Sequence, residues 1–159
     1  MLKRIVKILL FISLFILFIP SYNKYRLEKR VDEILLSKET SIYDGYIYIP
    51  KFNYKNMIKK GDKALDENLV SMHELSDSIG GTNIILSGHN NKYVFHKLYY
   101  LTLGDEIIIS DFNIDKRYIV NEIKKVNIND SSIFNMEGLK LITCTNNNQI
   151  RLVVICTEK

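Results

Sequence analysis

A thiol and a guanidinium near the C-terminus have the types and spacing to do chemistry together. Cys144 ends the apolar run 139–144, and Arg151 begins the run 151–155 after a polar, Asn-rich link. Two apolar runs separated by such a link predict a β-hairpin, whose flanks face each other. We therefore expect Cys144 and Arg151 to lie side by side. A cation beside a thiol favours the thiolate nucleophile and can stabilise the oxyanion that its attack creates.

A cysteine nucleophile also needs a proton-transfer group, and the chain contains 3 histidines. His89 follows a β-branched apolar run and a glycine, where a strand would deliver a side chain to a cleft and a substrate could approach closely. His96 lies in an apolar-rich segment typical of a helical turn, and His73 lies in a polar, acidic stretch. The local context favours His89 as the acid/base.

Several motifs, in order, resemble the signature of sortases, the cysteine transpeptidases of Gram-positive cell surfaces. The resemblance rests on the Leu-Ile-Thr-Cys run ending at Cys144, on Arg151 downstream and on the Gly-His pair ending at His89. It covers most of the chain beyond residue 43. Further matching segments are Tyr-Ile-Tyr-Ile-Pro at 46–50, Gly-Gly-Thr-Asn at 80–83, Phe-His-Lys-Leu at 95–98 and Leu-Gly-Asp-Glu at 103–106.

Three positions depart from the family's pattern without removing a catalytic group. Lys140 stands where the family usually has threonine before its Cys motif, Asn90 where arginine often follows the histidine, and Ile79 where proline is usual. The link between Cys144 and Arg151 is also shorter than is common in the family.

The pattern of β-type segments predicts the fold class. Such segments dominate from residue 44 onward and alternate with turn signals, at 45–50, 83–86, 106–110, 117–124, 139–144 and 151–155. Many short strands with this spacing predict a barrel or a sandwich, with short helical pieces near 62–70 and 92–99. The resemblance implies an all-β fold with short helices, namely the closed, eight-stranded sortase β-barrel, preceded by an N-terminal membrane-anchor helix.

The resemblance also implies an activity, that of a cysteine transpeptidase acting on secreted proteins with a C-terminal sorting signal of the Leu-Pro-x-Thr-Gly type. Cys144 would attack the Thr carbonyl and form a thioacyl intermediate, Arg151 would stabilise the oxyanion, and His89 would protonate the departing Gly amine. The acceptor would be an amine of a peptidoglycan precursor or of a pilin. Three further positions match those that line the family's peptide groove: Ser87, Ile142 and Thr143.

Two absences in the sequence bear on the subclass. No Asp-Pro-Phe lid motif precedes the first strand, and little room for a long helix exists between residues 125 and 138. The sequence therefore favours a small class A or class D sortase over the pilin-polymerising and haem-protein-anchoring classes. Two alternative functions stay open: a thiol peptidase with water as acceptor, and a non-catalytic, membrane-tethered peptide-binding module with an inert thiol.

The N-terminus resembles a membrane anchor. Basic residues at positions 3, 4 and 7 precede an apolar stretch from residue 8 to Pro20. Spanning a bilayer core takes about 20 residues at about 1.5 Å each, and residues 5–22 nearly suffice. No small-x-small cleavage site follows, which favours an uncleaved anchor over a removed signal peptide.

We therefore expect an anchor at 1–23, a juxtamembrane helix and linker at 24–42, and a catalytic domain at 43–159. This organisation predicts a single-pass protein of the cell membrane. The resemblance implies that its catalytic domain is extracellular.

Composition and charge argue against other classes of protein. With 159 residues, 47% of them hydrophobic, and a net charge of +4, the chain is typical of one globular domain with an appendage. Its basic residues form no stripe with interleaved aromatics, so nucleic-acid binding has no support. Zinc would require CxxC or HxxxH spacing, which the chain lacks. The acidic residues 62, 66, 67 and 74 could form a calcium site but lack EF-hand spacing, so we expect no cofactor.

The second cysteine is not expected to pair with the first. In the predicted hairpin Cys156 lies several residues beyond Arg151 along its strand. At about 3.3 Å per residue, this separation from Cys144 exceeds the ~7 Å limit for a disulfide. Cys156 is instead expected to behave as a small buried or half-buried hydrophobe.

Overall fold

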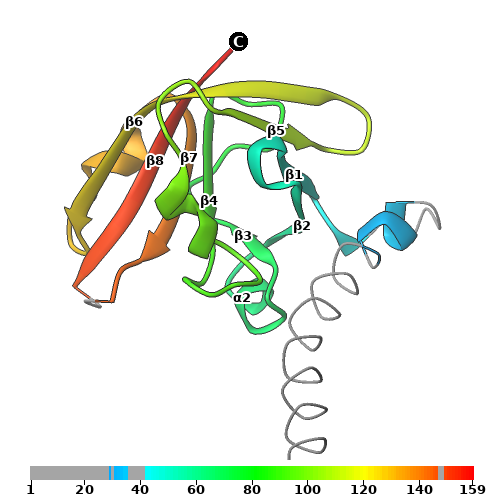
Figure 1. Ribbon diagram of the computed structural model, residues 1–159, viewed down its shortest axis with the longest axis horizontal. Coiled ribbons are helices and arrows are strands. Elements are labelled where there is room, and N and C mark those ends of the chain that lie inside the picture. The colour runs from blue at the N-terminus through cyan, green and yellow to red at the C-terminus, as the bar shows by residue number, and fades with distance from the viewer. Residues whose placement is uncertain (1–28, 30, 36–41, 147–148) are drawn as a thin grey trace, which may run out of the picture.

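The computed structural model describes residues 29, 31–35, 42–146 and 149–159, and its dominant element is a closed barrel (Figure 1). The barrel strands follow the order β1-β2-β3-β4-β7-β8-β6-β5. In chain order they are β1 (Gly45–Ile49), β2 (Tyr54–Lys60), β3 (Val70–Met72), β4 (Asn83–Ser87), β5 (Glu106–Ser110), β6 (Asp115–Asn127), β7 (Gly138–Cys144) and β8 (Ile150–Glu158). The predicted all-β, eight-stranded closed barrel is confirmed.

Short helices connect the strands without forming a layer of their own. They are η2 (Pro50–Phe52), the single-turn α2 (Lys63–Asp66), η3 (His96–Tyr100) and η4 (Ser132–Asn135). The helical pieces predicted near 62–70 and 92–99 correspond to α2 and η3, which are both shorter than expected.

The predicted anchor at 1–23 lies outside the described residues, whereas residues 31–35 are helical, within the segment expected to be juxtamembrane helix. None of the helices in the described part of the chain is long and apolar enough to cross a membrane.

All six strand segments predicted from the sequence are present, but β2 and β3 were missed. The β2 sequence Tyr-Lys-Asn-Met-Ile-Lys-Lys is rich in polar residues, yet its Asn56 is buried. The side-chain amide of Asn56 donates to the Tyr54 hydroxyl and to the carbonyl of Asn68, both at 3.1 Å. Because these bonds satisfy the buried amide, a polar residue can occupy a core strand. Strand β3 was missed because it contains only 3 residues, too few to show a period.

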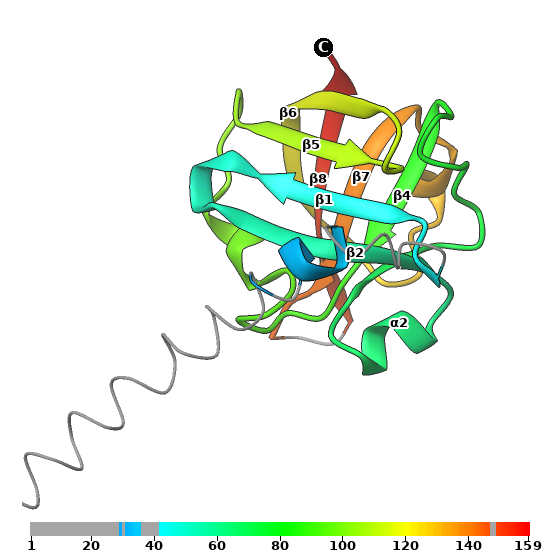
Figure 2. The same ribbon diagram turned by 90° about the vertical axis from the view of Figure 1, so that its right-hand side faces the viewer.

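Strand β4 lies parallel to β7, and this pairing determines where the functional residues lie. Its register places Ser87 beside Ile142, so β4 and β7 end at the same edge of the barrel. Figure 2 shows β4, β7 and β8 running behind β1, β2 and β5, which cross in front of them. Because the chain segments after β4 and after β7 both begin at that edge, His89 and Cys144 are brought to the same end of the barrel.

Apolar residues fill two separate clusters on the two faces of β7. Leu139 and Leu141 point into the barrel interior. Ile142 points outward, where it packs with Ile85 and with Ile133 of η4 in a smaller cluster. Alternate residues of a strand face opposite sides, so one strand can contribute to both clusters. The outer cluster holds the connection between β6 and β7 against the barrel wall.

Candidate active site

The β7–β8 hairpin places the thiol beside the guanidinium. Cys144 is the last residue of β7, and its register partner on β8 is Arg151, as the hairpin pattern predicts. The next backbone bond closes the turn, with the amide of Thr145 donating to the carbonyl of Ile150 at 3.0 Å. The side chain of Cys144 is exposed to solvent, so a substrate can reach the sulfur.

Backbone and side-chain hydrogen bonds fix the segment that carries His89 against β7. The amide of Gly88 donates to the carbonyl of Ile142 at 3.0 Å, and the hydroxyl of Thr143 donates to the carbonyl of Gly88 at 2.8 Å. The carbonyl of His89 accepts from the amide of Phe95 at 3.0 Å. His89 therefore begins a segment that is tied on one side to the strand of Cys144.

Only glycine fits at position 88. A Cβ atom there would lie 2.5 Å from Cγ1 of Val94 and 2.8 Å from Cδ2 of Phe95, and both of these side chains are buried. Such distances are far below van der Waals contact, so a larger residue would displace the segment that carries His89. The sequence suggested that Gly88 lets a substrate approach closely. The structure shows that Gly88 is required by the packing of side chains beneath the site.

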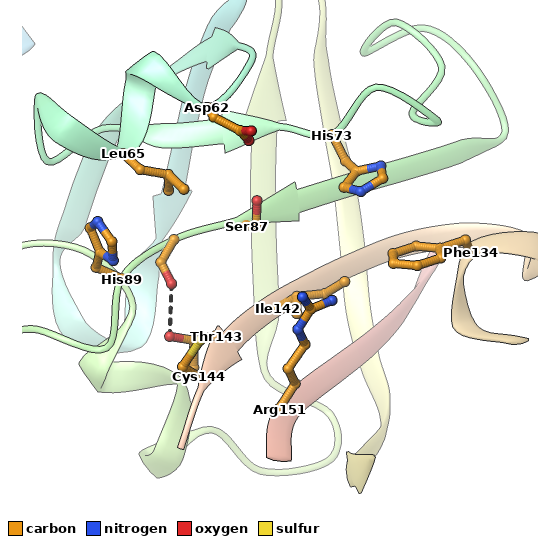
Figure 3. Close-up of a pocket in the computed structure, with 11 residues that line it drawn as sticks. Asp62, Leu65, His73, Ser87, His89, Phe134, Ile142, Thr143, Cys144 and Arg151 are labelled. Carbon is orange, nitrogen blue, oxygen red and sulfur yellow. Dashed lines mark hydrogen bonds between the residues drawn. The ribbon is translucent and has the colours of Figure 1, made fainter. Parts of the chain in front are cut away.

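A pocket of about 370 Å³ joins these elements, and all six of the predicted site residues line it. In Figure 3, His89 lies on one side and Arg151 on the other, with Thr143 and Cys144 between them. The complete lining is Asp62, Leu65, His73, Ser87, Gly88, His89, Phe134, Ile142, Thr143, Cys144 and Arg151. The geometry brings the predicted residues together, while the roles assigned to them stay predictions.

Besides Gly88, four lining residues were not predicted as part of the site: Asp62, Leu65, His73 and Phe134. The ring of His73 stacks on the ring of Phe134, with centroids 4.8 Å apart and planes inclined by 18°. These two residues come from the segment after β3 and from η4, which are far apart in the sequence. No local pattern could have joined them.

Asp62 lines the pocket as a single carboxylate. In the part of the chain that the structure describes, no group of three or more His, Cys, Asp or Glu side chains is arranged to hold a metal ion. The expectation that the protein needs no cofactor stays a prediction.

The two thiols of the hairpin lie in different surroundings, because Cys144 is exposed and Cys156 is buried. Burial raises the pKa of the Cys156 thiol to about 12, so this cysteine stays protonated at neutral pH.

The phenol of Tyr99, on η3, donates to the carbonyl of Cys144 at 3.4 Å. The pKa of Tyr99 is raised by burial and, to a smaller extent, by the charge that Cys144 can carry. Tyr99 therefore covers the backbone of Cys144 and remains a neutral hydrogen-bond donor.

Comparison with known proteins identifies the family. The model of the sortase domain family matches residues 47–159, which is most of the chain. No curated protein matches the chain significantly.

Solved structures that resemble the chain include sortase C1 from Streptococcus agalactiae, with 31% identity and a TM-score of 0.66 over 74% of this chain and 68% of that one. Another is a pilus-related sortase C of Group B Streptococcus, with 26% identity and a TM-score of 0.68 over 75% and 68% of the two chains. A third is sortase C-1 from Actinomyces oris, with 25% identity and a TM-score of 0.68 over 74% and 72%.

The protein belongs to the sortase family and is a cysteine transpeptidase of that family. The three structures carry the class C name, whereas the absence of a lid motif led us to favour a small class A or class D enzyme. Similarity of the barrel does not distinguish one sortase class from another, so the class of this chain stays a prediction.

Proposed function

We propose that this sortase cleaves a Leu-Pro-x-Thr-Gly-type sorting signal between Thr and Gly and transfers the secreted protein to an amine of the cell wall. The observation that carries the proposal is the register pair Cys144–Arg151, which shares one pocket with His89. A nucleophile, an oxyanion donor and a proton carrier then converge on one cavity of suitable size for a peptide segment.

In the first half-reaction the thiolate of Cys144 attacks the Thr carbonyl carbon, and the carbonyl oxygen takes up the negative charge. Arg151, opposite Cys144, donates hydrogen bonds to this oxyanion and orients the peptide. When the intermediate collapses, the C–N bond to Gly breaks. His89 gives its proton to the departing amine, leaving a thioester on Cys144.

In the second half-reaction an acceptor amine attacks the thioester carbonyl. His89, now neutral, takes the proton from the attacking nitrogen, and the new amide forms as the Cys144 thiolate departs. The cycle ends with the thiolate and the protonated histidine restored. The acceptor belongs to a peptidoglycan precursor or to a pilin.

The peptide groove is expected to run along the ends of β4 and β7. Ser87 and Ile142 are register partners on these strands, and both line the pocket. Thr143 also lines it, but this residue is only 2% exposed and its hydroxyl already donates to the carbonyl of Gly88. We therefore assign Ser87 and Ile142 to peptide contact, and Thr143 to holding the two strand ends together beneath the peptide.

We also propose that residues 1–23 anchor the enzyme in the cell membrane, with the catalytic domain outside the cell. The support is the apolar N-terminal sequence and its lack of a cleavage site. In the native host, the intact N-terminus should be recovered in the membrane fraction. Recovery of a mature chain that begins near residue 21 would contradict the anchor.

One alternative function has specific support, namely a thiol peptidase in which water accepts the acyl group. The support is that the side chain of Cys144 is exposed to solvent. The test is to incubate the full-length protein in detergent with a library of sorting peptides, with and without amines that mimic peptidoglycan stems and pilin lysines. Mass spectrometry should detect amide products whenever the correct amine is present. Hydrolysis products alone, at every amine concentration, would establish the peptidase, and failure to cleave any peptide would contradict the proposed function.

A further inference from the structure

The residue that departs most from the family's Cys motif is fully buried in this structure. Lys140 occupies the middle of β7, where the family usually has threonine, and it is 0% exposed. Its register partners are Ile85 on β4 and Ile155 on β8, which belong to the outer apolar cluster. A lysine ammonium is rarely buried without partners, because leaving water is costly for a charge. The hydrogen-bond partners of the ammonium therefore indicate why a lysine is present at this position.

The ammonium of Lys140 links two strands to the β6–β7 connection (residues 128–137). It donates to the side-chain oxygen of Asn83, at the start of β4, and to the carbonyl of Met136, at the end of η4. The amide nitrogen of the Asn83 side chain in turn donates to the carbonyl of Phe134 at 2.9 Å. Two carbonyls of the connection, at 134 and 136, are thus held by one small network.

Asp77 supports this network from the other side. Its carboxylate accepts from the backbone amides of Thr82 at 3.1 Å and of Asn83 at 2.9 Å, which fixes the start of β4. Burial lowers the pKa of Lys140, and the charge of Asp77 opposes that shift by favouring the ammonium. The network therefore consists of the Lys140 ammonium, the Asp77 carboxylate and the Asn83 side-chain amide, and each of these groups has a hydrogen-bond partner.

The backbone of the connection is bonded to the β7–β8 hairpin at its first residue, where the amide of Ile128 donates to the carbonyl of Gln149 at 2.8 Å. Beyond that residue its backbone bonds are local, so the rest of the connection depends on side chains. The amide of Asp130 donates to the carbonyl of Asn127 at 3.0 Å, and that of Phe134 to the carbonyl of Ser131 at 3.1 Å. These bonds shape the turn but do not attach it to the barrel. Attachment of this part comes from Ile133, which is buried in the outer cluster, from Phe134 and Met136, which pack against that cluster, and from the Lys140 network. A threonine at position 140 would carry its hydroxyl on Cβ and could not replace the long lysine side chain.

The far side of the connection forms a wall of the peptide pocket. Phe134 stacks on His73, and both rings line the cavity that contains Cys144 and Arg151 (Figure 3). We propose that Lys140 is a positioning residue for the substrate, whose ammonium fastens the β6–β7 connection to β4 and β7 and so keeps Phe134 in place as a wall of the peptide pocket. This inference rests on the proposed function of that pocket.

The direct test replaces Lys140 with methionine, which keeps an unbranched apolar chain and removes the donors. Lys140→Met should raise KM for the sorting peptide by about tenfold and leave kcat within about twofold, because the wall binds peptide but does not touch the reacting carbonyl. The matched control is Lys116→Met. Lys116 pairs with Glu158 on the surface of β6 and β8, and its loss should change neither constant.

A double-mutant cycle separates positioning from general stability. Phe134→Ala should raise KM to a similar extent, and adding Lys140→Met to it should change KM by less than about twofold, because the wall is already gone. If the two effects multiply instead, Lys140 does not act through Phe134 and the proposal is wrong. A fall in kcat equal to the fall in kcat/KM, with KM unchanged, would also overturn it.

Amide hydrogen exchange tests the network without any substrate. Residues 131–137 should exchange faster in Lys140→Met than in the wild type, while β1 and β5 keep their rates. Equal exchange in the two proteins would refute the tether even if no sorting peptide is ever cleaved, so failure of this inference is distinct from failure of the proposed function. If Lys140→Met does not fold, Asn83→Ala removes a bond partner of both Lys140 and Phe134. That variant should then show the faster exchange and the raised KM, and wild-type values for it would contradict the tether.

Discussion

The two ends of the β7–β8 hairpin carry the same functional group in opposite surroundings. At the loop end, Cys144 is exposed, faces Arg151 and lines a pocket. At the other end, Cys156 is 0% exposed, pairs with Leu139 on β7 and with Val120 on β6, and burial raises its pKa to about 12. Under the proposed assignment of Cys144 as the nucleophile, solvent access and a neighbouring cation, rather than the residue type, distinguish the reactive thiol from the packing one.

The largest effect is expected at the exposed thiol. Cys144→Ala should abolish cleavage and transfer of sorting peptides, because Cys156 is buried at the other end of the hairpin and cannot replace it. Circular dichroism and the melting temperature should stay close to those of the wild type, since an exposed residue at a strand end is removed. Activity above background in a folded Cys144→Ala protein would show that another group is the nucleophile.

Loss of the proton carrier should have the next largest effect. His89→Ala should reduce kcat by about 10²–10⁴-fold, the usual contribution of a positioned general acid. Steady-state kinetics with the sorting peptide would measure this loss. His96→Ala is the matched control, because His96 is exposed on η3 and does not line the pocket. A similar loss in both variants, or a loss only in the control, would move the acid/base role away from His89.

The guanidinium should contribute less than the thiol, and its role can be separated into two parts. Arg151→Lys keeps the positive charge beside Cys144 but loses the two parallel donors of the guanidinium. If Arg151 stabilises the oxyanion, kcat should fall by about 10²–10³-fold, with a smaller change in KM. If Arg151 supplies only a positive charge beside the thiol, lysine should restore most of the rate. Near wild-type kcat in Arg151→Lys would therefore refute the oxyanion role.

The smallest effect on activity is expected at the buried thiol. Cys156→Ala should keep kcat/KM within about twofold and lower the free energy of unfolding by about 1–2 kcal/mol, because a small cavity forms in the barrel core. The raised folded-state pKa adds a pH dependence. The pKa of the thiol is near its ordinary value of 9.0 in the unfolded chain and about 12 in the folded one, so the wild type should lose stability as pH rises through this window. Chemical denaturation at pH 7 and pH 10 should show that Cys156→Ala lacks this part of the loss.

Six of the strands and the hairpin could be predicted because their signals are local, whereas the choice of a closed barrel over a sandwich came from the resemblance to sortases. The alternation of β-type runs and turns, and the polar link before Arg151, are properties of short stretches of sequence. Strand β2 was missed because the lysines and the buried Asn56 hide its period. Hydrogen bonds to partners that include Tyr54 and Asn68 make that asparagine acceptable in a core. Contacts with other parts of the chain, rather than local propensity, make this segment a strand.

The site was predictable only where the motifs lie. Cys144, His89 and Arg151 stand in recognisable local contexts, whereas the His73–Phe134 pair exists only because η4 folds back over the barrel. Lys140 was visible in the sequence as a departure from the family's pattern. Its burial and its bonds to Asn83 and Met136 depend on the arrangement of three separate segments, which no local spacing specifies.

The central claim is that Cys144, and not Cys156, carries the acyl group. The most direct measurement is to mix the enzyme with a sorting peptide, quench in acid within the first turnover and locate the acyl adduct by peptide mapping. We expect a thioester of the peptide's Thr carbonyl on Cys144 that disappears when an acceptor amine is added. An adduct on Cys156, or cleavage of the peptide without any adduct on Cys144, would contradict it.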